Sequence, residues 1–226
     1  SVTGPLDYGL RTYTVLAENT RAYPGGWEPR ALPQPAPGEF TIGTLNLQRF
    51  FETATAFPAR LAKLKLYVRD ILRSPDILAV QEVGSLAALE RLANELGGYR
   101  AYLGATNDPS GIAPGFLVKT ATVTVLTAAS TPDREQIHDR PPFRLDAQIG
   151  GQRLALLCVH IRSLTDIADA QVQAKRKAQA TAINALARGL SGENIPYAIL
   201  GDFNSLPYDD GYADMLALIG AGLNLT

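Results

Sequence analysis

The chain has 226 residues, of which 46% are hydrophobic and 19% charged, so it can bury one sizeable core and is not a disordered segment. Its formal net charge of -1 excludes a generally polybasic surface, and contact with nucleic acid would need a local patch of arginine and lysine. The single cysteine, Cys158, lies in an apolar run, which predicts a buried small hydrophobe and excludes both a disulfide framework and a cysteine-rich zinc site.

The first 38 residues differ in composition from the rest. Residues 23–38 are rich in proline and glycine and can hold little regular structure. We therefore predict an N-terminal extension and connector over 1–38, with a short strand at 12–16, and a folded domain over 39–226.

The domain begins with strands and helices in alternation. Apolar alternation and β-branched residues predict a first strand at 40–46, which ends at Asn46. A helix over 58–72, apolar on one face, follows. The next strand, 77–80, runs directly into Gln81 and Glu82.

The middle of the chain predicts one helix and several strands. Ser85 is a suitable N-cap for this helix, and Gly97 lies just beyond its apolar face. Two of the later strands are joined by the sequence Gly-Gly at 150–151, a strong hairpin signal, and the second of them ends at His160. The expected strands are 99–103, 115–119, 122–126, 143–149 and 153–159.

In the last part of the chain, the predicted helices and strands alternate again. Residues 166–190 predict an amphipathic helix whose basic run 175–177 lies in solvent. A strand at 196–200 leads into the sequence Gly-Asp-Phe-Asn at 201–204, and a final helix is expected at 212–219. Strands alternating with helices, with a hairpin in the middle, predict a mixed α/β fold with its helices outside.

Polar side chains directly follow several of these strands. Strand ends let a rigid sheet aim polar groups at one point, so we expect these side chains to converge on one cleft. Together they offer carboxylate and amide oxygens for a hard cation and an imidazole that can donate to a phosphate oxygen. Taken singly, each has a plainer interpretation as a turn former, a loop start or a structural histidine. The set is Asn46, Glu82, His160, Asp202 and Asn204.

This joint pattern resembles the endonuclease/exonuclease/phosphatase superfamily, the DNase I-like metal-dependent phosphoesterases. The resemblance extends over roughly residues 40 to 220, and the Gly-Asp-Phe-Asn sequence is its most specific part. Its motifs are Thr44-Leu-Asn-Leu47, Ala79-Val-Gln-Glu82, Gly115-Phe-Leu-Val118, Val159-His160 and Gly201-Asp-Phe-Asn204. Two further stretches, His160-Ile-Arg-Ser163 and Lys175-Arg-Lys-Ala-Gln179, look like the branch of predicted secreted bacterial nucleases.

The resemblance implies a four-layer sandwich in the α/β class, two packed mixed β-sheets flanked by helices, here without its C-terminal strands. It implies a divalent cation, Mg²⁺ or else Mn²⁺ or Ca²⁺, held by Glu82 with the help of Asn46, and nucleic acid as the substrate. It also implies a secreted or periplasmic protein. The sequence contains no membrane span and leaves a cytoplasmic location and the oligomeric state open.

The resemblance also implies roles for the remaining site residues. Asp202 would orient or deprotonate the attacking water, and Asn204 would fix the phosphate or Asp202. His160 would stabilise the transition state. Arg140 and Arg162 are expected to contact phosphate.

The end of the chain departs from the family pattern. Members finish with a strand that ends in an Asp-His pair, whereas this chain has only His138 and His160 and no such pair after Asn204. We therefore expect either a fragment or a derivative with impaired chemistry. Three functions stay open: a nuclease, a phosphatase acting on lipid or small-molecule phosphoesters, and a catalytically inactive binding domain of the same fold.

Overall fold

The computed structural model describes residues 2–3, 5–9, 12–15, 18–20, 29–205 and 212–223. The chain forms two compact units, residues 1–30 and residues 31–226. In the smaller unit β2 (Leu6–Gly9) pairs antiparallel with β3 (Thr12–Val15), and β1 (Val2–Thr3) pairs with β4 (Asn19–Thr20). The strand expected at 12–16 corresponds to β3, while residue 16 and the connector residues 21–28 lie outside the described part.

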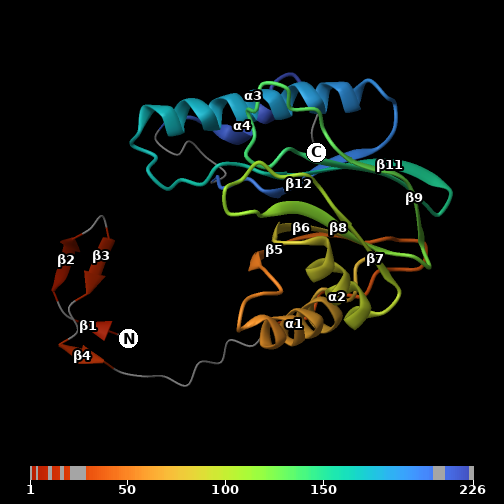
Figure 1. The fold of residues 1–226 in the computed structure, drawn as a ribbon, viewed down its shortest axis with the longest axis horizontal. Coiled ribbons are helices and arrows are strands. Elements are labelled where there is room, and N and C mark those ends of the chain that lie inside the picture. Colours follow the sequence, from red (N-terminus) through yellow and green to blue (C-terminus); the bar gives the residue numbers. More distant parts are fainter. Residues whose placement is uncertain are drawn as a thin grey trace. The chain divides into compact units, whose positions relative to one another are not determined.

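Two four-stranded sheets form the centre of the larger unit (Figure 1), in the strand orders β5-β6-β8-β7 and β12-β11-β10-β9. Each sheet has one parallel pair, β5 with β6 and β11 with β12, and its other pairs are antiparallel. Every strand predicted for this unit is present. The bounds are β5 (Ile42–Phe50), β6 (Ile77–Val83), β7 (Tyr99–Leu103), β8 (Ala113–Lys119), β9 (Val123–Ser130), β10 (Phe143–Ile149), β11 (Gln152–His160) and β12 (Tyr197–Asp202).

Helices cover the outer face of each sheet (Figure 1). On one side lie α1, which continues into the π-helical turn η1, and α2, and on the other side lie α3 and α4. The four-layer sandwich implied by the resemblance is therefore confirmed. The bounds are α1 (Phe57–Leu66), η1 (Tyr67–Ile71), α2 (Leu86–Leu96), α3 (Ala170–Ser191) and α4 (Met215–Gly220).

Strand β6 shows how the layers are held together. Its side chains alternate between two cores, because successive residues of a strand point to opposite faces. Ile77 packs in the core between the two sheets, whereas Leu78 packs under α1 and α2. A strand that is buried on both faces is apolar along its whole length, as the sequence of β6 is up to Val80.

The predicted N-cap and C-terminal glycine of α2 and the predicted Gly-Gly hairpin turn are confirmed. The Ser85 hydroxyl accepts a hydrogen bond from the Ala88 N–H at 3.0 Å, which satisfies one free N–H of the first turn of α2. Gly97 closes the helix with a φ of +71°, and Gly150 and Gly151 connect β10 and β11 with positive φ angles.

One prediction about α3 is wrong. Lys177 is exposed and Lys175 is half-buried, but only 1% of Arg176 is exposed. Consecutive helical residues point about 100° apart, so a basic run cannot lie on one face as a unit. The other buried residues on the face of Arg176 are Gln179, Ala180, Ile183, Ala187 and Leu190.

The larger unit includes part of the predicted connector. The Leu32 N–H donates to the Ile71 carbonyl at 2.9 Å, and the Leu32 carbonyl accepts from Arg73 Nε at 3.3 Å. These bonds hold the chain against the end of η1. In the part of the chain that the structure describes, no helix combines the length and apolar character that a membrane crossing requires.

Candidate active site

Beside the core between the two sheets, the Asn46 amide links a carboxylate of each sheet. Asn46 of β5 donates from Nδ2 to Glu82 Oε1 at 3.0 Å and to Asp202 Oδ2 at 2.9 Å. The two carboxylate oxygens that it bonds therefore lie no more than about 6 Å apart, so Glu82 and Asp202 converge on one place. Because Glu82 belongs to the first sheet and Asp202 to the second, this amide fixes the sheets to each other where both carboxylates emerge.

Glu82 lies in a strained bulge of β6. Its φ is +61°, a left-handed conformation that is unfavourable for a residue with a side chain. The register with β8 shifts here by one residue, opposite Pro114, which has no N–H to donate. The bulge redirects the Glu82 side chain, and strain of this kind is typical of functional sites. The predicted strand ended at residue 80, so the bulge was not predicted.

Asp202 is held through both of its oxygens. The Asn204 N–H donates to Oδ1 at 2.9 Å, and the Asn46 amide occupies Oδ2. Asn204 has a φ of +44°, and its side chain donates to the Ile161 carbonyl at 3.0 Å. The turn after β12 thereby fixes the direction of the Asp202 carboxylate, 29% of whose side chain is exposed.

His160 ends β11 beside this carboxylate. Its Nε2 lies 3.9 Å from Asp202 Oδ2, and its Nδ1 is buried with no hydrogen-bond partner among the described residues. Burial lowers the pKa of His160 to about 4, with a further lowering by Arg140, while Asp202 and Glu82 act in the opposite direction. The imidazole is therefore neutral at pH 7.

Arg140 lies behind His160. Its Nη1 pairs with Asp108 Oδ2 at 2.5 Å, and Nε and Nη2 donate to the carbonyls of His160 and Ile161 at 3.3 and 3.1 Å. Only 8% of the residue is exposed. Its donors are thus directed at protein groups, and the guanidinium supports the end of β11 from inside.

Asp108, the partner of Arg140, was not predicted from the sequence. Its stretch contains proline and serine, as an ordinary turn does, and the contact spans 32 residues of sequence. Burial by itself would raise the pKa of Asp108, but hydrogen bonds from Ser110 and the charge of Arg140 outweigh burial and lower it.

Two arginines lie around the loops that leave β11 and β12. Arg162, two residues after His160, is half-buried, and its backbone N–H donates to Gln179 Oε1 at 2.8 Å. The buried Arg176 donates from Nη1 to the Arg162 carbonyl and from Nη2 to the Asn204 carbonyl, the latter at 2.9 Å. Helix α3 thus ties together the two loops that follow His160 and Asp202. Its apolar periodicity was the signal that could have predicted a buried Arg176.

The donor set suits a hard divalent cation. Mg²⁺ is usually held by one or two carboxylates and keeps several waters, and Glu82 and Asp202 are the two carboxylates that could hold it here. No group of three or more His, Cys, Asp or Glu side chains arranged for a metal occurs in the described ranges. Asn46, expected to assist at the metal, bonds both carboxylates through its nitrogen and accepts the Gln48 N–H through Oδ1 at 2.7 Å.

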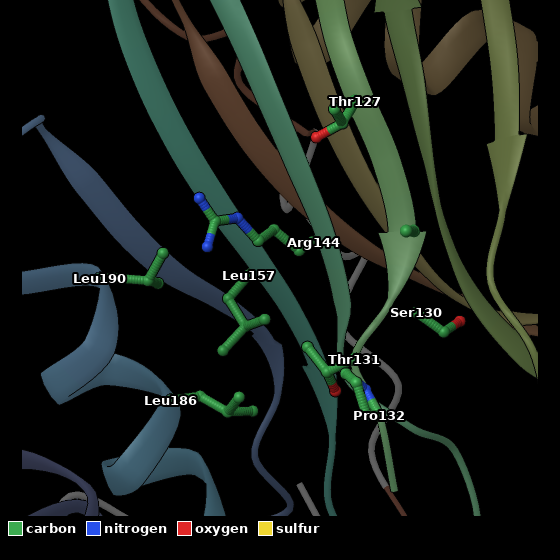
Figure 2. Close-up of a pocket in the computed structure, with 9 residues that line it drawn as sticks. Thr127, Ser130, Thr131, Pro132, Arg144, Leu157, Leu186 and Leu190 are labelled. Atoms are coloured by element: carbon green, nitrogen blue, oxygen red, sulfur yellow. The ribbon is translucent and has the colours of Figure 1, made fainter. Parts of the chain in front are cut away.

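A separate pocket of about 270 Å³ lies under the C-terminal half of α3. Figure 2 shows Leu186 and Leu190 of the helix facing Leu157 of the sheet, with Arg144 in the wall. None of the site residues described above lines it, and its lining is mainly apolar. We therefore assign the chemistry to the strand ends and not to this pocket.

Comparison with known proteins gives a clear result for the sequence as a whole. The model of the Endonuclease/Exonuclease/phosphatase family matches residues 43–223, which include all seven site residues predicted from the sequence. A search of curated proteins gives no match.

Solved structures show the same fold. Humanized D. rerio TDP2 has 18% identity and a TM-score of 0.59, with 81% of this chain and 67% of that chain covered. D. rerio TDP2 complexed with single strand DNA product has 19% identity and a TM-score of 0.58, with 80% and 64% covered. An endonuclease/exonuclease/phosphatase family protein from Bacteroides thetaiotaomicron has 17% identity and a TM-score of 0.60, with 76% and 66% covered. The chain thus spans about two-thirds of the length of these structures.

Proposed function

The chain belongs to the endonuclease/exonuclease/phosphatase family, and on that premise we propose that it is a metal-dependent phosphodiesterase that hydrolyses DNA or RNA. The observation that carries this proposal is the Asn46 amide, which joins Glu82 of one sheet to Asp202 of the other. Two carboxylates held this close repel each other, and a divalent cation held by Glu82 and Asp202 would relieve the repulsion.

Glu82 and Asp202 are the proposed ligands, with Mg²⁺ the preferred ion and Mn²⁺ or Ca²⁺ as alternatives. When bound, the cation neutralises charge on the phosphate and helps the leaving oxygen to depart. The bulge at Glu82 serves this purpose because it turns the carboxylate towards Asn46 and the second sheet.

The remaining steps use the chain's own groups. Asp202, fixed by the Asn204 N–H, orients the attacking water. His160 is neutral at pH 7, and the neighbouring Asp202 carboxylate favours the tautomer with its proton on Nε2. That N–H donates to a phosphate oxygen as negative charge develops there.

Nucleic acid is the proposed substrate class. One structure of the same fold, D. rerio TDP2, is complexed with a single strand DNA product. Arg162 is the proposed phosphate contact, since it is half-buried in the loop directly after His160. For Arg140 we propose a positioning role instead, because its donors bond Asp108 and the carbonyls at the end of β11.

The test uses two substrates and two charge-removing variants. Wild type, Glu82→Gln and Asp202→Asn are assayed on plasmid DNA and on bis(4-nitrophenyl) phosphate, each with Mg²⁺ and with EDTA. We expect EDTA to abolish activity and each substitution to lower kcat by about 100-fold or more. Glu90→Gln on α2 and Asp70→Asn on η1 are matched controls, since both carboxylates are exposed.

Two additions, 4-nitrophenyl phosphate as a third substrate and a measurement of DNA binding, distinguish the other two functions. Turnover of 4-nitrophenyl phosphate without turnover of DNA would show that the protein is a phosphatase and not a nuclease. If no substrate is turned over but DNA is still bound, the protein is a binding domain and not an enzyme. Full activity of Glu82→Gln would contradict the assigned metal ligands.

A further inference from the structure

The segment after Asn46 is strained. Gln48 and Arg49 have φ angles of +54° and +57°, although neither is glycine. The Gln48 N–H donates to Asn46 Oδ1 at 2.7 Å, so the turn is fixed by the same amide that bridges the two carboxylates. Left-handed residues with side chains persist only where the surrounding structure imposes that backbone conformation, and they cluster at functional sites. Arg49 itself is exposed.

Phe51 supports this arginine next to Glu82. The Phe51 ring lies so close to Gly84 that a Cβ at position 84 would come within 2.2 Å of its Cδ1. The Gly84 N–H also donates to the Phe50 carbonyl at 2.9 Å. Since Gly84 follows Glu82 by two residues, the aromatic ring is fixed beside the bulge that carries the proposed metal ligand.

Arg49 lies over this ring. Its guanidinium carbon is 5.6 Å from the centroid of Phe51. Contact with a ring face restrains the side chain, while the N–H donors, which point outward in the guanidinium plane, remain able to bind an anion. The pair therefore presents a preoriented positive charge beside Gly84, two residues after Glu82.

We propose that Arg49 binds a phosphate of the substrate chain next to the phosphodiester that is cleaved. The inference rests on the proposed function and narrows it to polynucleotides, because a small phosphodiester has no second phosphate to reach Arg49. The chain as a whole carries a net charge of -1, so attraction for a polyanion has to come from local groups of this kind.

The chain provides a matched control for this arginine. Arg100 is also exposed and lies over an aromatic ring, 5.5 Å from the centroid of Tyr102. It belongs to β7, at the opposite edge of the same sheet from β5. Arg100→Ala therefore removes the same charge and the same kind of contact far from β5 in the strand order.

The experiment measures kcat/KM for a single-stranded oligonucleotide and for bis(4-nitrophenyl) phosphate, in wild type, Arg49→Ala, Arg49→Lys, Phe51→Leu and Arg100→Ala. We expect Arg49→Ala to lower kcat/KM for the oligonucleotide about tenfold more than for the small substrate. The slope of log kcat/KM against log salt should become less negative by about 0.7, as expected for one lost phosphate contact. Arg49→Lys should keep the salt slope of wild type. The kcat/KM of Phe51→Leu for the oligonucleotide should lie between the values of wild type and Arg49→Ala. Arg100→Ala should match wild type in both kcat/KM and salt slope.

Equal losses on both substrates, or equal effects of Arg49→Ala and Arg100→Ala, would overturn the inference and leave the phosphodiesterase intact. If wild type cleaves neither substrate, the proposed function fails. Fluorescence anisotropy of a labelled oligonucleotide then decides the inference by itself, and unchanged binding by Arg49→Ala would overturn it.

Discussion

Gly201 lies so close to Val159 that a Cβ at position 201 would fall 2.0 Å from the Val159 carbonyl oxygen. The two residues are partners in the parallel register of β11 and β12, and each directly precedes a site residue, His160 and Asp202. With a φ of +139°, Gly201 has a backbone conformation that side chains rarely allow. The apolar run of β12 therefore ends in glycine because close approach to β11 sets Asp202 level with His160.

Replacing Gly201 should destabilise the folded chain strongly. Gly201→Ala is expected to lower the free energy of unfolding by about 3 kcal/mol or more, since the methyl group meets backbone atoms that cannot yield. Urea denaturation measures the loss. Gly189→Ala is the control, because nothing lies within 4 Å of its added methyl group in α3, and it should stabilise the chain by up to about 1 kcal/mol. A loss below 1 kcal/mol at 201 would contradict the close approach.

Arg176 should matter for both stability and activity. Arg176→Ala leaves the carbonyls of Arg162 and Asn204 without their buried donor, at a cost of about 2–4 kcal/mol. The loops after His160 and Asp202 then lose their common support, so kcat should fall more than KM changes. Lys177→Ala removes the exposed charge one residue later and should shift the free energy of unfolding by less than about 0.5 kcal/mol. Equal stability and kcat for the two variants would show that the buried contacts of Arg176 are unimportant.

Low pH should weaken the ion pair between Asp108 and Arg140, which lies behind His160. The pKa of Asp108 is lower in the folded chain, so its contribution to stability is present above the unfolded pKa and disappears as pH falls through the folded value. At pH 7 we expect the free energy of unfolding to be about 2 kcal/mol higher for wild type than for Asp108→Asn. Urea titrations from neutral pH down to below about pH 4 should show this difference shrinking. A difference that is constant with pH would mean that the Asp108 charge contributes nothing.

The sequence predicted the strands of the larger unit and the polar residues at their ends, because apolar runs and glycine turns are local signals. Asn46, Glu82 and Asp202 were predicted in this way at strand ends, and the structure brings them into contact. Only Asp202 ends its strand, since β5 continues to Phe50 and β6 to Val83. The rest depends on long-range pairing. The bulge at Glu82 arises from the register with β8, and the Arg140 pair forms across 32 residues, so neither leaves a local pattern. The position of Arg176 was missed for another reason: its charge was given more weight than its helical spacing.

Metal binding can be tested without catalysis. A cation that binds only the folded chain raises its free energy of unfolding by RT ln(1 + [L]/Kd), so about 10 mM Mg²⁺ at a Kd near 1 mM should add about 1.4 kcal/mol and raise Tm by a few degrees. Glu82→Gln and Asp202→Asn should each abolish this rise, because one carboxylate alone leaves Mg²⁺ mostly to its waters. Asn46→Asp should enlarge it, since a third carboxylate would replace the amide that bridges the other two. Glu90→Gln, on the exposed surface of α2, should respond to Mg²⁺ as wild type does. If Mg²⁺ raises Tm equally in wild type and in Glu82→Gln, the ion binds elsewhere and the carboxylate pair is not its site.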